Sequence, residues 1–173
     1  MSAPLKILSP LDLGESSFTA LRVAEEIAKQ SGGKVYLLHV VPADEFALLQ
    51  EKYRPWESGG PDVDAACEIA RRRLEQTARE RIGNRVPYEV MTRIGDAAEM
   101  VLAVEKELDA DLLVIGRERS TPTSAGLRSA FLDRLLNDSF CPVLMLPRTR
   151  DEHGSLEAHL GRHRAVTTRR GGE

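Results

Sequence analysis

A glycine that directly follows a buried strand is the first feature of this sequence that points to chemistry. Leu112–Ile115 is a short apolar run typical of a strand buried on both faces, and Gly116 comes next. A polar run then leads to an amphipathic segment over 125–138. Open α/β sheets bind ligands at the carboxyl ends of their strands, where free N–H groups of the following helix attract anions. We therefore expect a ligand site beside Gly116.

The residues that most often do catalytic or metal chemistry do not form a convincing set. His39 has no partnering Ser or Cys motif, so a structural histidine is expected. Cys67 and Cys141 give neither a disulfide framework nor metal spacing, and we expect them to act as small buried hydrophobes. His159 and His163 could hold a metal on one helical face, but they lie in a polar tail. With no nucleophile elbow, zincin motif, Walker A loop or catalytic carboxylate pair, we expect no enzyme and no protein-bound metal.

The elements that position Gly116 follow from hydrophobic periodicity. Short apolar runs predict strands over 5–8, 34–41, 86–91, 112–115 and 143–146. Stripes at helical spacing predict helices over about 16–31, 62–82, 97–108 and 125–138. Short loops between alternating strands and helices indicate right-handed βαβ units and one parallel sheet. The third strand is the most polar, which favours an edge position.

Two segments stand outside this pattern. The connection over 42–61 is long for a compact domain, so it is expected to cover something or to be flexible. From Arg148 the apolar periodicity stops. We therefore predict an α/β domain over 1–147 and a polar, disordered tail over 148–173.

Composition limits the function classes. The chain has 173 residues, 42% of them hydrophobic and 29% charged, as in a soluble globular protein. Its net charge of −3 predicts no general affinity for nucleic acid. No apolar run approaches the roughly 20 residues that span a bilayer. The N-terminus lacks a signal-peptide layout, so a cytoplasmic protein is expected.

Five segments resemble, in order and spacing, the universal stress protein family: Ile7–Asp12, Leu37–Val41, Gly95–Glu99, Asp109–Gly116 and Cys141–Leu144. The resemblance runs from about residue 5 to residue 147. It implies an adenine-nucleotide α-hydrolase-like fold: an open, parallel, five-stranded sheet in order 3-2-1-4-5 with helices on both faces. The first and fourth strands are then neighbours at the topological switch point.

The same resemblance implies a homodimer. Members of the family commonly dimerise, often through the fifth strand. In this chain the fifth strand is apolar and consists of four residues: Val143, Leu144, Met145 and Leu146. We therefore expect these residues to form a dimer edge.

The nucleotide-binding branch of the family carries Gly-x2-Gly-x9-Gly-Ser/Thr after the fourth strand, and this chain keeps only its start. Gly116 matches the first glycine, but the later positions hold Arg119, Ser129 and Ala130. Glycine serves in such loops because backbone N–H groups must approach phosphates closely, often at positive φ. An arginine adds a long side chain, and an alanine removes a hydroxyl ligand.

Other residues of the implied nucleotide site remain. Pro10, Asp12 and Val40 stand where the family holds adenosine, and Phe131 closes the loop that begins at Gly116. A helix-capping carboxylate is an equally good interpretation of Asp12. Arginine side chains could replace the missing glycines by binding polyphosphate, or could form a solvated basic loop. These arginines are Arg117, Arg119 and Arg128.

The sequence therefore predicts a stress-response or signalling protein that resembles universal stress proteins. It is expected to bind ATP with Mg²⁺, or another adenine nucleotide, through a degenerate glycine loop. The alternative is a dimeric interaction module of the same fold that binds no nucleotide.

Overall fold

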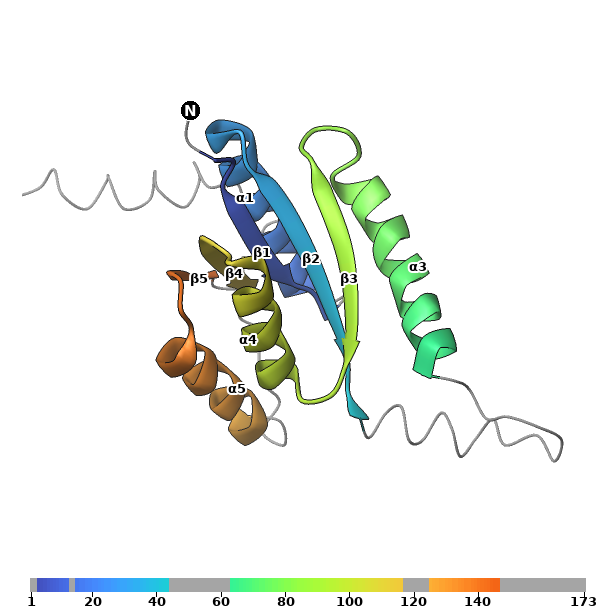
Figure 1. Cartoon of the computed structure of the whole chain (residues 1–173), viewed down its shortest axis with the longest axis vertical. Helices are drawn as coiled ribbons and strands as arrows, with labels where there is room; N and C mark the ends of the chain where they lie inside the picture. Colours follow the sequence, from blue (N-terminus) through green and yellow to red (C-terminus); the bar gives the residue numbers. More distant parts are fainter. Residues whose placement is uncertain (1–2, 13–14, 44–62, 117–124, 147–173) are drawn as a thin grey trace, which may run out of the picture.

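The structure, a computed structural model, describes residues 3–12, 15–43, 63–116 and 125–146 and places a parallel sheet between two helical layers (Figure 1). In chain order the elements are β1 Lys6–Pro10, α1 Glu15–Ser31, β2 Lys34–Val41, α3 Val63–Arg81, β3 Tyr88–Ile94, α4 Ala97–Leu108, β4 Leu112–Gly116, α5 Ala125–Asp138 and β5 Val143–Leu146. The long connection over 42–61, apart from its first two residues, and the tail over 148–173 lie outside the described residues.

The five strands run in the order β3-β2-β1-β4-β5, all parallel, which confirms the predicted topology. Leu8 of β1 is in register with Leu113 of β4, and Pro10 is the last residue of β1 in register with β2, opposite Leu38. The chain order reverses between β1 and β4. The chain therefore leaves these two neighbouring strands toward opposite faces of the sheet, and the crevice at their carboxyl ends is the expected place for a ligand.

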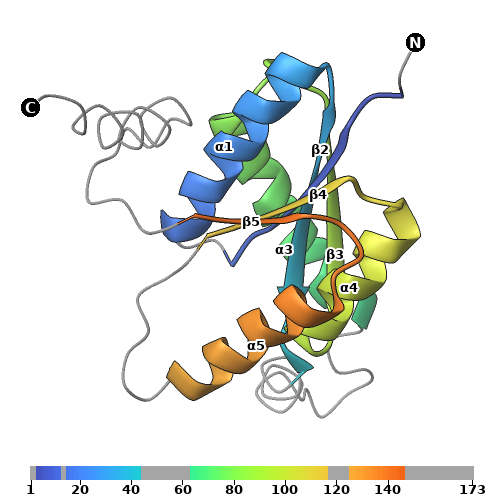
Figure 2. The same ribbon diagram turned by 90° about the vertical axis from the view of Figure 1, so that its left-hand side faces the viewer.

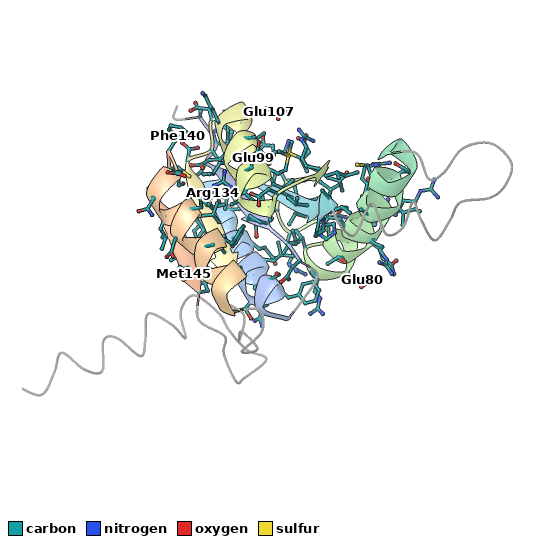
Figure 3. The ribbon with its side chains drawn as sticks, turned by 90° about the horizontal axis from the view of Figure 1, so that it is seen from below. Glu80, Glu99, Glu107, Arg134, Phe140 and Met145 are labelled. Carbon is teal, nitrogen blue, oxygen red and sulfur yellow. The ribbon has the colours of Figure 1, made fainter. Side chains whose placement is uncertain are left out.

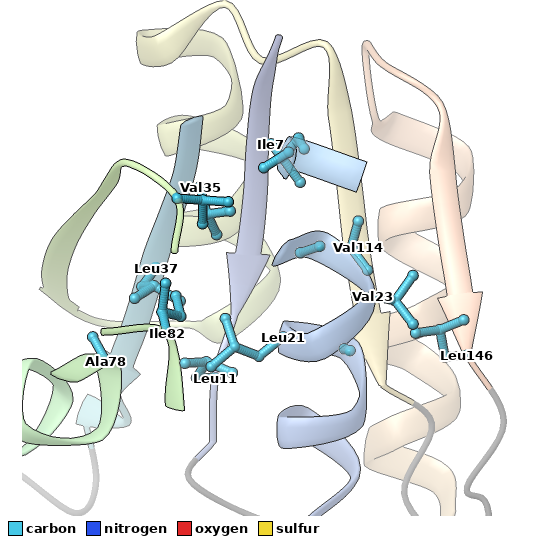
Figure 4. Close-up of a cluster of buried hydrophobic side chains, with 14 of the residues drawn as sticks. Ile7, Leu11, Leu21, Val23, Val35, Leu37, Ala78, Ile82, Val114 and Leu146 are labelled. Atoms are coloured by element: carbon cyan, nitrogen blue, oxygen red, sulfur yellow. The ribbon is translucent and has the colours of Figure 1, made fainter. Parts of the chain in front are cut away.

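Alternating side chains of the strands build a hydrophobic core on each face of the sheet. Ile7, Val35 and Leu37 pack with α1 and α3 on one face (Figure 4). Leu8, Leu38 and Leu113 pack with α4 and α5 on the other face. A view along the sheet shows the two layers on its opposite sides (Figure 2). No helix in the described ranges combines the length and the apolar character needed to cross a bilayer.

The predicted start of α4 is confirmed. The Asp96 side chain caps the helix and its Oδ1 accepts a hydrogen bond from the Glu99 backbone N–H at 2.9 Å. Two strand boundaries were wrong. β1 continues to Pro10, and β3 covers Tyr88–Ile94 rather than 86–91. The pairing with β2, which extends as far as Val41 opposite Ile94, sets the end of β3.

Helical spacing in the sequence predicts a buried stripe on α4 of Ala97, Val101, Val104 and Leu108, and the structure differs from it. Ala97 is exposed, and the carboxylate of Glu105, only 1% exposed, is buried one turn before the end of the helix. Its Oε1 accepts hydrogen bonds from Ser139 Oγ at 2.7 Å and from the backbone N–H groups of Phe140 and Cys141, each at 2.8 Å. These bonds explain how a charge is tolerated there and fix the α5–β5 corner to α4.

The two cysteines are free and only partly buried, which is less than predicted, and Cys141 packs against the core cluster that includes Leu113. Desolvation, together with hydrogen bonding to Glu105, raises the pKa of the Cys141 thiol to about 12. The thiol therefore stays protonated over the physiological pH range.

Candidate functional site

A cavity of about 120 Å³ opens at the carboxyl ends of β1, β2 and β4, between the sheet and helices α4 and α5. Five of the residues that line it were predicted for the ligand site: Pro10, Asp12, Val40, Gly116 and Phe131. They come from β1, the loop after it, β2, β4 and α5. They converge because the sheet order places β1 between β2 and β4.

Six further residues line the cavity and were not predicted for the site: Leu11, Ser17, Leu38, Ala97, Val101 and Ile115. Most of them were recognisable only as apolar positions of strands or helices. Ser17, five residues after Asp12, is the exception, because Ser and Asp near a helix start commonly bond to each other or to the backbone. Ala97 is exposed at the cavity and not in the core, which corrects its predicted place in the α4 stripe.

Of the remaining predicted positions, the structure describes the side chain of Ala130 alone. Arg117 and Arg119 lie outside the described residues, as do the side chains of Arg128 and Ser129. Ala130 is described and exposed, and it is not one of the lining residues. The structure therefore brings together the part of the site attributed to adenosine.

Asp12 and Ser17 form the polar end of the cavity. Ser17, a buried residue of α1, donates a hydrogen bond from Oγ to Asp12 Oδ1. Ser17 Oγ also accepts the Asp12 backbone N–H at 3.2 Å. These two bonds fix the direction of the carboxylate, which is exposed. A carboxylate held in this way is an acceptor for hydroxyl groups of a ligand.

Val40 contributes its backbone. In a parallel strand the N–H and C=O of one residue point to the same neighbouring strand, and alternate residues point to the same side. The Leu38 carbonyl faces β1, where it accepts the Leu11 N–H at 2.8 Å. Val40, two residues on, therefore faces the same side, beyond the last registered residue pair, Pro10 with Leu38. One donor and one acceptor thus point toward the crevice where β1 has left the sheet.

The residues around the cavity are suited to binding a ligand. Apolar side chains from Leu38, Val101 and Ile115 surround the few polar groups, and Phe131 adds an aromatic ring. Such a wall suits a flat heteroaromatic group with hydrogen bonds at its edge. Within the described part of the chain, no three His, Cys, Asp or Glu side chains lie close enough to hold a metal ion.

An ion pair joins the two helices that wall the cavity. Arg134 of α5, labelled in Figure 3, has its Nη1 3.0 Å from Asp96 Oδ1 at the start of α4. Ala97 follows Asp96, and Phe131 is one turn before Arg134, so the pair lies next to two lining residues. Both side chains are about half exposed, which limits the pair's contribution to stability to less than about 1 kcal/mol.

Comparison with known proteins covers almost the whole described chain. Residues 5–147 match the sequence model of the universal stress protein family. Over 147 residues the chain is 28% identical to universal stress protein MJ0531 of Methanocaldococcus jannaschii, covering 85% of this chain and 84% of that protein.

Solved structures share the fold. A universal stress protein in complex with cAMP is 19% identical, with a TM-score of 0.59 over 86% of this chain and 100% of that chain. The universal stress protein from Archaeoglobus fulgidus in complex with dAMP is 17% identical, with a TM-score of 0.56 over 84% of this chain and 98% of that chain.

Proposed function

This chain belongs to the universal stress protein family, and from that premise we propose that it binds an adenine nucleotide at the carboxyl ends of β1, β2 and β4. The observation that carries the proposal is the convergence of Asp12, Val40 and Gly116 on one cavity. The complexes of two proteins of similar fold with cAMP and dAMP support the adenine part of it.

The size of the cavity indicates which part of a nucleotide it would enclose. Its volume of about 120 Å³ is below the roughly 300–1,000 Å³ of pockets that enclose a whole small molecule. We therefore place the adenine ring inside, where the Val40 backbone offers one donor and one acceptor to its edge. The ribose hydroxyls would then bind the Asp12 carboxylate.

The phosphates would leave the cavity past Gly116. Backbone N–H groups at the start of the following segment, with Arg117 or Arg119, supply the positive partners. ATP would bring Mg²⁺ on its phosphate oxygens, since Mg²⁺ commonly binds through substrate phosphates and few protein ligands. The role that fits this reading is stress response or signalling in the cytoplasm.

A second candidate function rests on the residues that interrupt the glycine motif. Arg119, Ser129 and Ala130 occupy the positions of two glycines and a hydroxyl residue. A chain that has lost phosphate binding could still act as a dimeric interaction module. In either case we propose a homodimer through β5, whose described pairing is with β4 alone and which therefore has a free edge.

Thermal melting with Mg-ATP tests the nucleotide proposal. At a concentration of about 100 times Kd, binding to the folded state alone adds about 2.7 kcal/mol. For a domain of this size that raises Tm by about 5–10 °C. The measurement is a melting curve followed by circular dichroism, with and without millimolar Mg-ATP.

Variants sharpen this test. Asp12→Asn should reduce the Tm shift, whereas Asp138→Asn, the same change at the far end of α5, should leave it intact. Arg119→Gly restores the second glycine and should enlarge the shift if the arginine obstructs phosphate. No shift for the wild-type chain at millimolar Mg-ATP would contradict nucleotide binding and favour the interaction module.

A further inference from the structure

The loop that carries Asp12 is also held from the face of the sheet that α1 and α3 cover. His39 lies on β2 between Leu38 and Val40, both lining residues. Because strand side chains alternate, the His39 side chain lies on the opposite face, toward α1 and α3. Its Nδ1 is 2.7 Å from the backbone oxygen of Leu11, a residue 28 positions earlier in the chain.

This contact fixes where the proton of the imidazole lies. A carbonyl oxygen carries no hydrogen, so His39 Nδ1 must be the donor. The neutral ring is therefore the Nδ1–H tautomer, with Nε2 unprotonated. The imidazolium form makes the same bond, because both of its nitrogens are donors.

The backbone of Leu11 is held by two hydrogen bonds, and the bond to His39 is one of them. Leu11 follows the end of β1; its N–H donates to the Leu38 carbonyl at 2.8 Å, and its own carbonyl accepts from His39. Its side chain, 3% exposed, is buried in the same core cluster as Leu21 of α1 (Figure 4). Backbone and side chain of Leu11 are thus fixed, and the next residue along the chain is Asp12.

We propose that His39 is a positioning residue of the nucleotide site: its Nδ1–H holds the Leu11 peptide, and through it sets the direction in which Asp12 faces the cavity. This inference rests on the proposed nucleotide binding for its functional consequence. A ligand that uses both the Val40 backbone and the Asp12 carboxylate needs the two at a constant separation. His39 precedes Val40 by one residue and is bonded to Leu11, which precedes Asp12 by one residue. It therefore connects the two groups directly.

A pair of variants with nearly the same shape separates the hydrogen bond from packing. His39→Asn places an amide N–H close to the position of Nδ1, whereas His39→Leu keeps the branching at Cγ without a donor. Removing the donor leaves the Leu11 carbonyl unpaired on the side of His39 and lets the loop move. We expect His39→Leu to weaken Mg-ATP binding about tenfold and His39→Asn to stay within about threefold of wild type.

Thr92→Val is the matched control. Thr92 is in register with His39 on β3, and its Oγ1 lies 3.4 Å from the Cys67 carbonyl oxygen, so the change removes a side-chain hydroxyl at the same level of the sheet without touching Leu11. It should not change nucleotide affinity. Equal affinities for His39→Leu and wild type, or equal losses for His39→Leu and His39→Asn, would overturn the proposal.

Two measurements do not depend on a nucleotide. The ¹⁵N chemical shifts of the His39 ring in the free protein should report a protonated Nδ1 and, at high pH, a bare Nε2. Hydrogen exchange of the Asp12 amide should be faster in His39→Leu than in His39→Asn or wild type. If wild type does not bind Mg-ATP, the proposed function fails, while these two readouts still support or reject the role of His39. An Nε2–H tautomer, or equal Asp12 exchange in all three proteins, would reject it.

Discussion

Cys141 shows how a single residue takes its properties from the elements around it. The sequence presented it as one of two unpaired cysteines before an apolar strand, with no sign of its neighbours. The fold brings the Glu105 carboxylate to it, and burial with this negative neighbour raises the pKa of the thiol to about 12 from the ordinary 9.0. The result is a thiol poorly suited to act as a nucleophile.

A pH dependence of stability follows from that shift. In the unfolded chain the Cys141 thiol ionises near pH 9, whereas in the folded chain it keeps its proton up to about pH 12. Its contribution to stability is therefore complete below pH 9 and is lost as the pH rises toward 12. We expect the free energy of unfolding of wild type to fall more steeply between pH 9 and pH 10.5 than that of Cys141→Ala.

Urea unfolding at a series of pH values measures this difference, and Cys67→Ala provides the matched control because it removes the other free cysteine. The difference between wild type and Cys67→Ala should change less with pH. Parallel pH profiles for wild type and Cys141→Ala would contradict the assigned pKa.

At the scale of elements, Glu105 determines how α4, α5 and β5 are joined. One carboxylate oxygen receives a hydroxyl and two backbone N–H groups from three consecutive residues of the α5–β5 corner. Its other oxygen has no hydrogen-bond partner within the described residues. A single carboxylate oxygen of Glu105 therefore accepts hydrogen bonds from three partly buried donors.

Removing that acceptor should be costly. Glu105→Leu removes the acceptor of the Phe140 and Cys141 N–H groups, while Ser139 Oγ keeps the Cys141 carbonyl oxygen at 3.0 Å. We expect a loss of about 3–5 kcal/mol in the free energy of unfolding. Glu105→Gln keeps an acceptor oxygen of the same shape without the charge and should cost about 1–2 kcal/mol. Chemical denaturation at pH 7 measures both.

The control for this prediction is Glu107→Gln on the same helix. Its carboxylate is 58% exposed and pairs with Arg93 at 3.0 Å, a surface contact that should contribute less than about 1 kcal/mol. If Glu105→Leu were no more destabilising than Glu107→Gln, the buried carboxylate would not be what holds the corner together.

In the molecule as a whole, the two edge strands of the sheet differ in polarity. β3 forms one edge and is the more polar, while β5 forms the other and consists of four apolar residues, three of them partly exposed. Phe140, which precedes β5, is 76% exposed, and Leu136 of α5 is 53% exposed. Exposed apolar side chains beside a strand edge that has no partner among the described residues favour association at this edge.

The proposed homodimer is tested by placing a charge on that edge. Val143→Lys or Met145→Lys should halve the mass measured by light scattering, because a buried lysine at a subunit interface lacks a partner. Circular dichroism confirms that each variant is folded. Glu89→Lys puts the same charge on the exposed side of β3 and should leave the mass unchanged. A wild-type monomer, or variants that keep the full mass, would rule out association through β5.

The sequence by itself determined the order and kind of the elements, because hydrophobic periodicity is a local property that each segment carries. The strand order 3-2-1-4-5 followed from the resemblance of five short segments to the universal stress protein family, and the structure confirms it. The boundaries of β1 and β3 were less well predicted, since the length of the neighbouring strand decides where pairing ends. The sequence predicts one site from Pro10, Asp12, Val40, Gly116 and Phe131, and the structure places all five around one cavity.

Only the tertiary structure decided the contacts between distant residues. Glu105 meets its donors 34 to 36 residues away, and His39 meets Leu11 at a separation of 28. Such contacts leave no periodic trace, because a buried glutamate on α4 occupies a position in the helical pattern that any apolar residue could fill. Hydrogen bonds between polar atoms depend on the path of the backbone in three dimensions. That path brings the loop after β1 onto β2, and so determines which polar groups face the cavity.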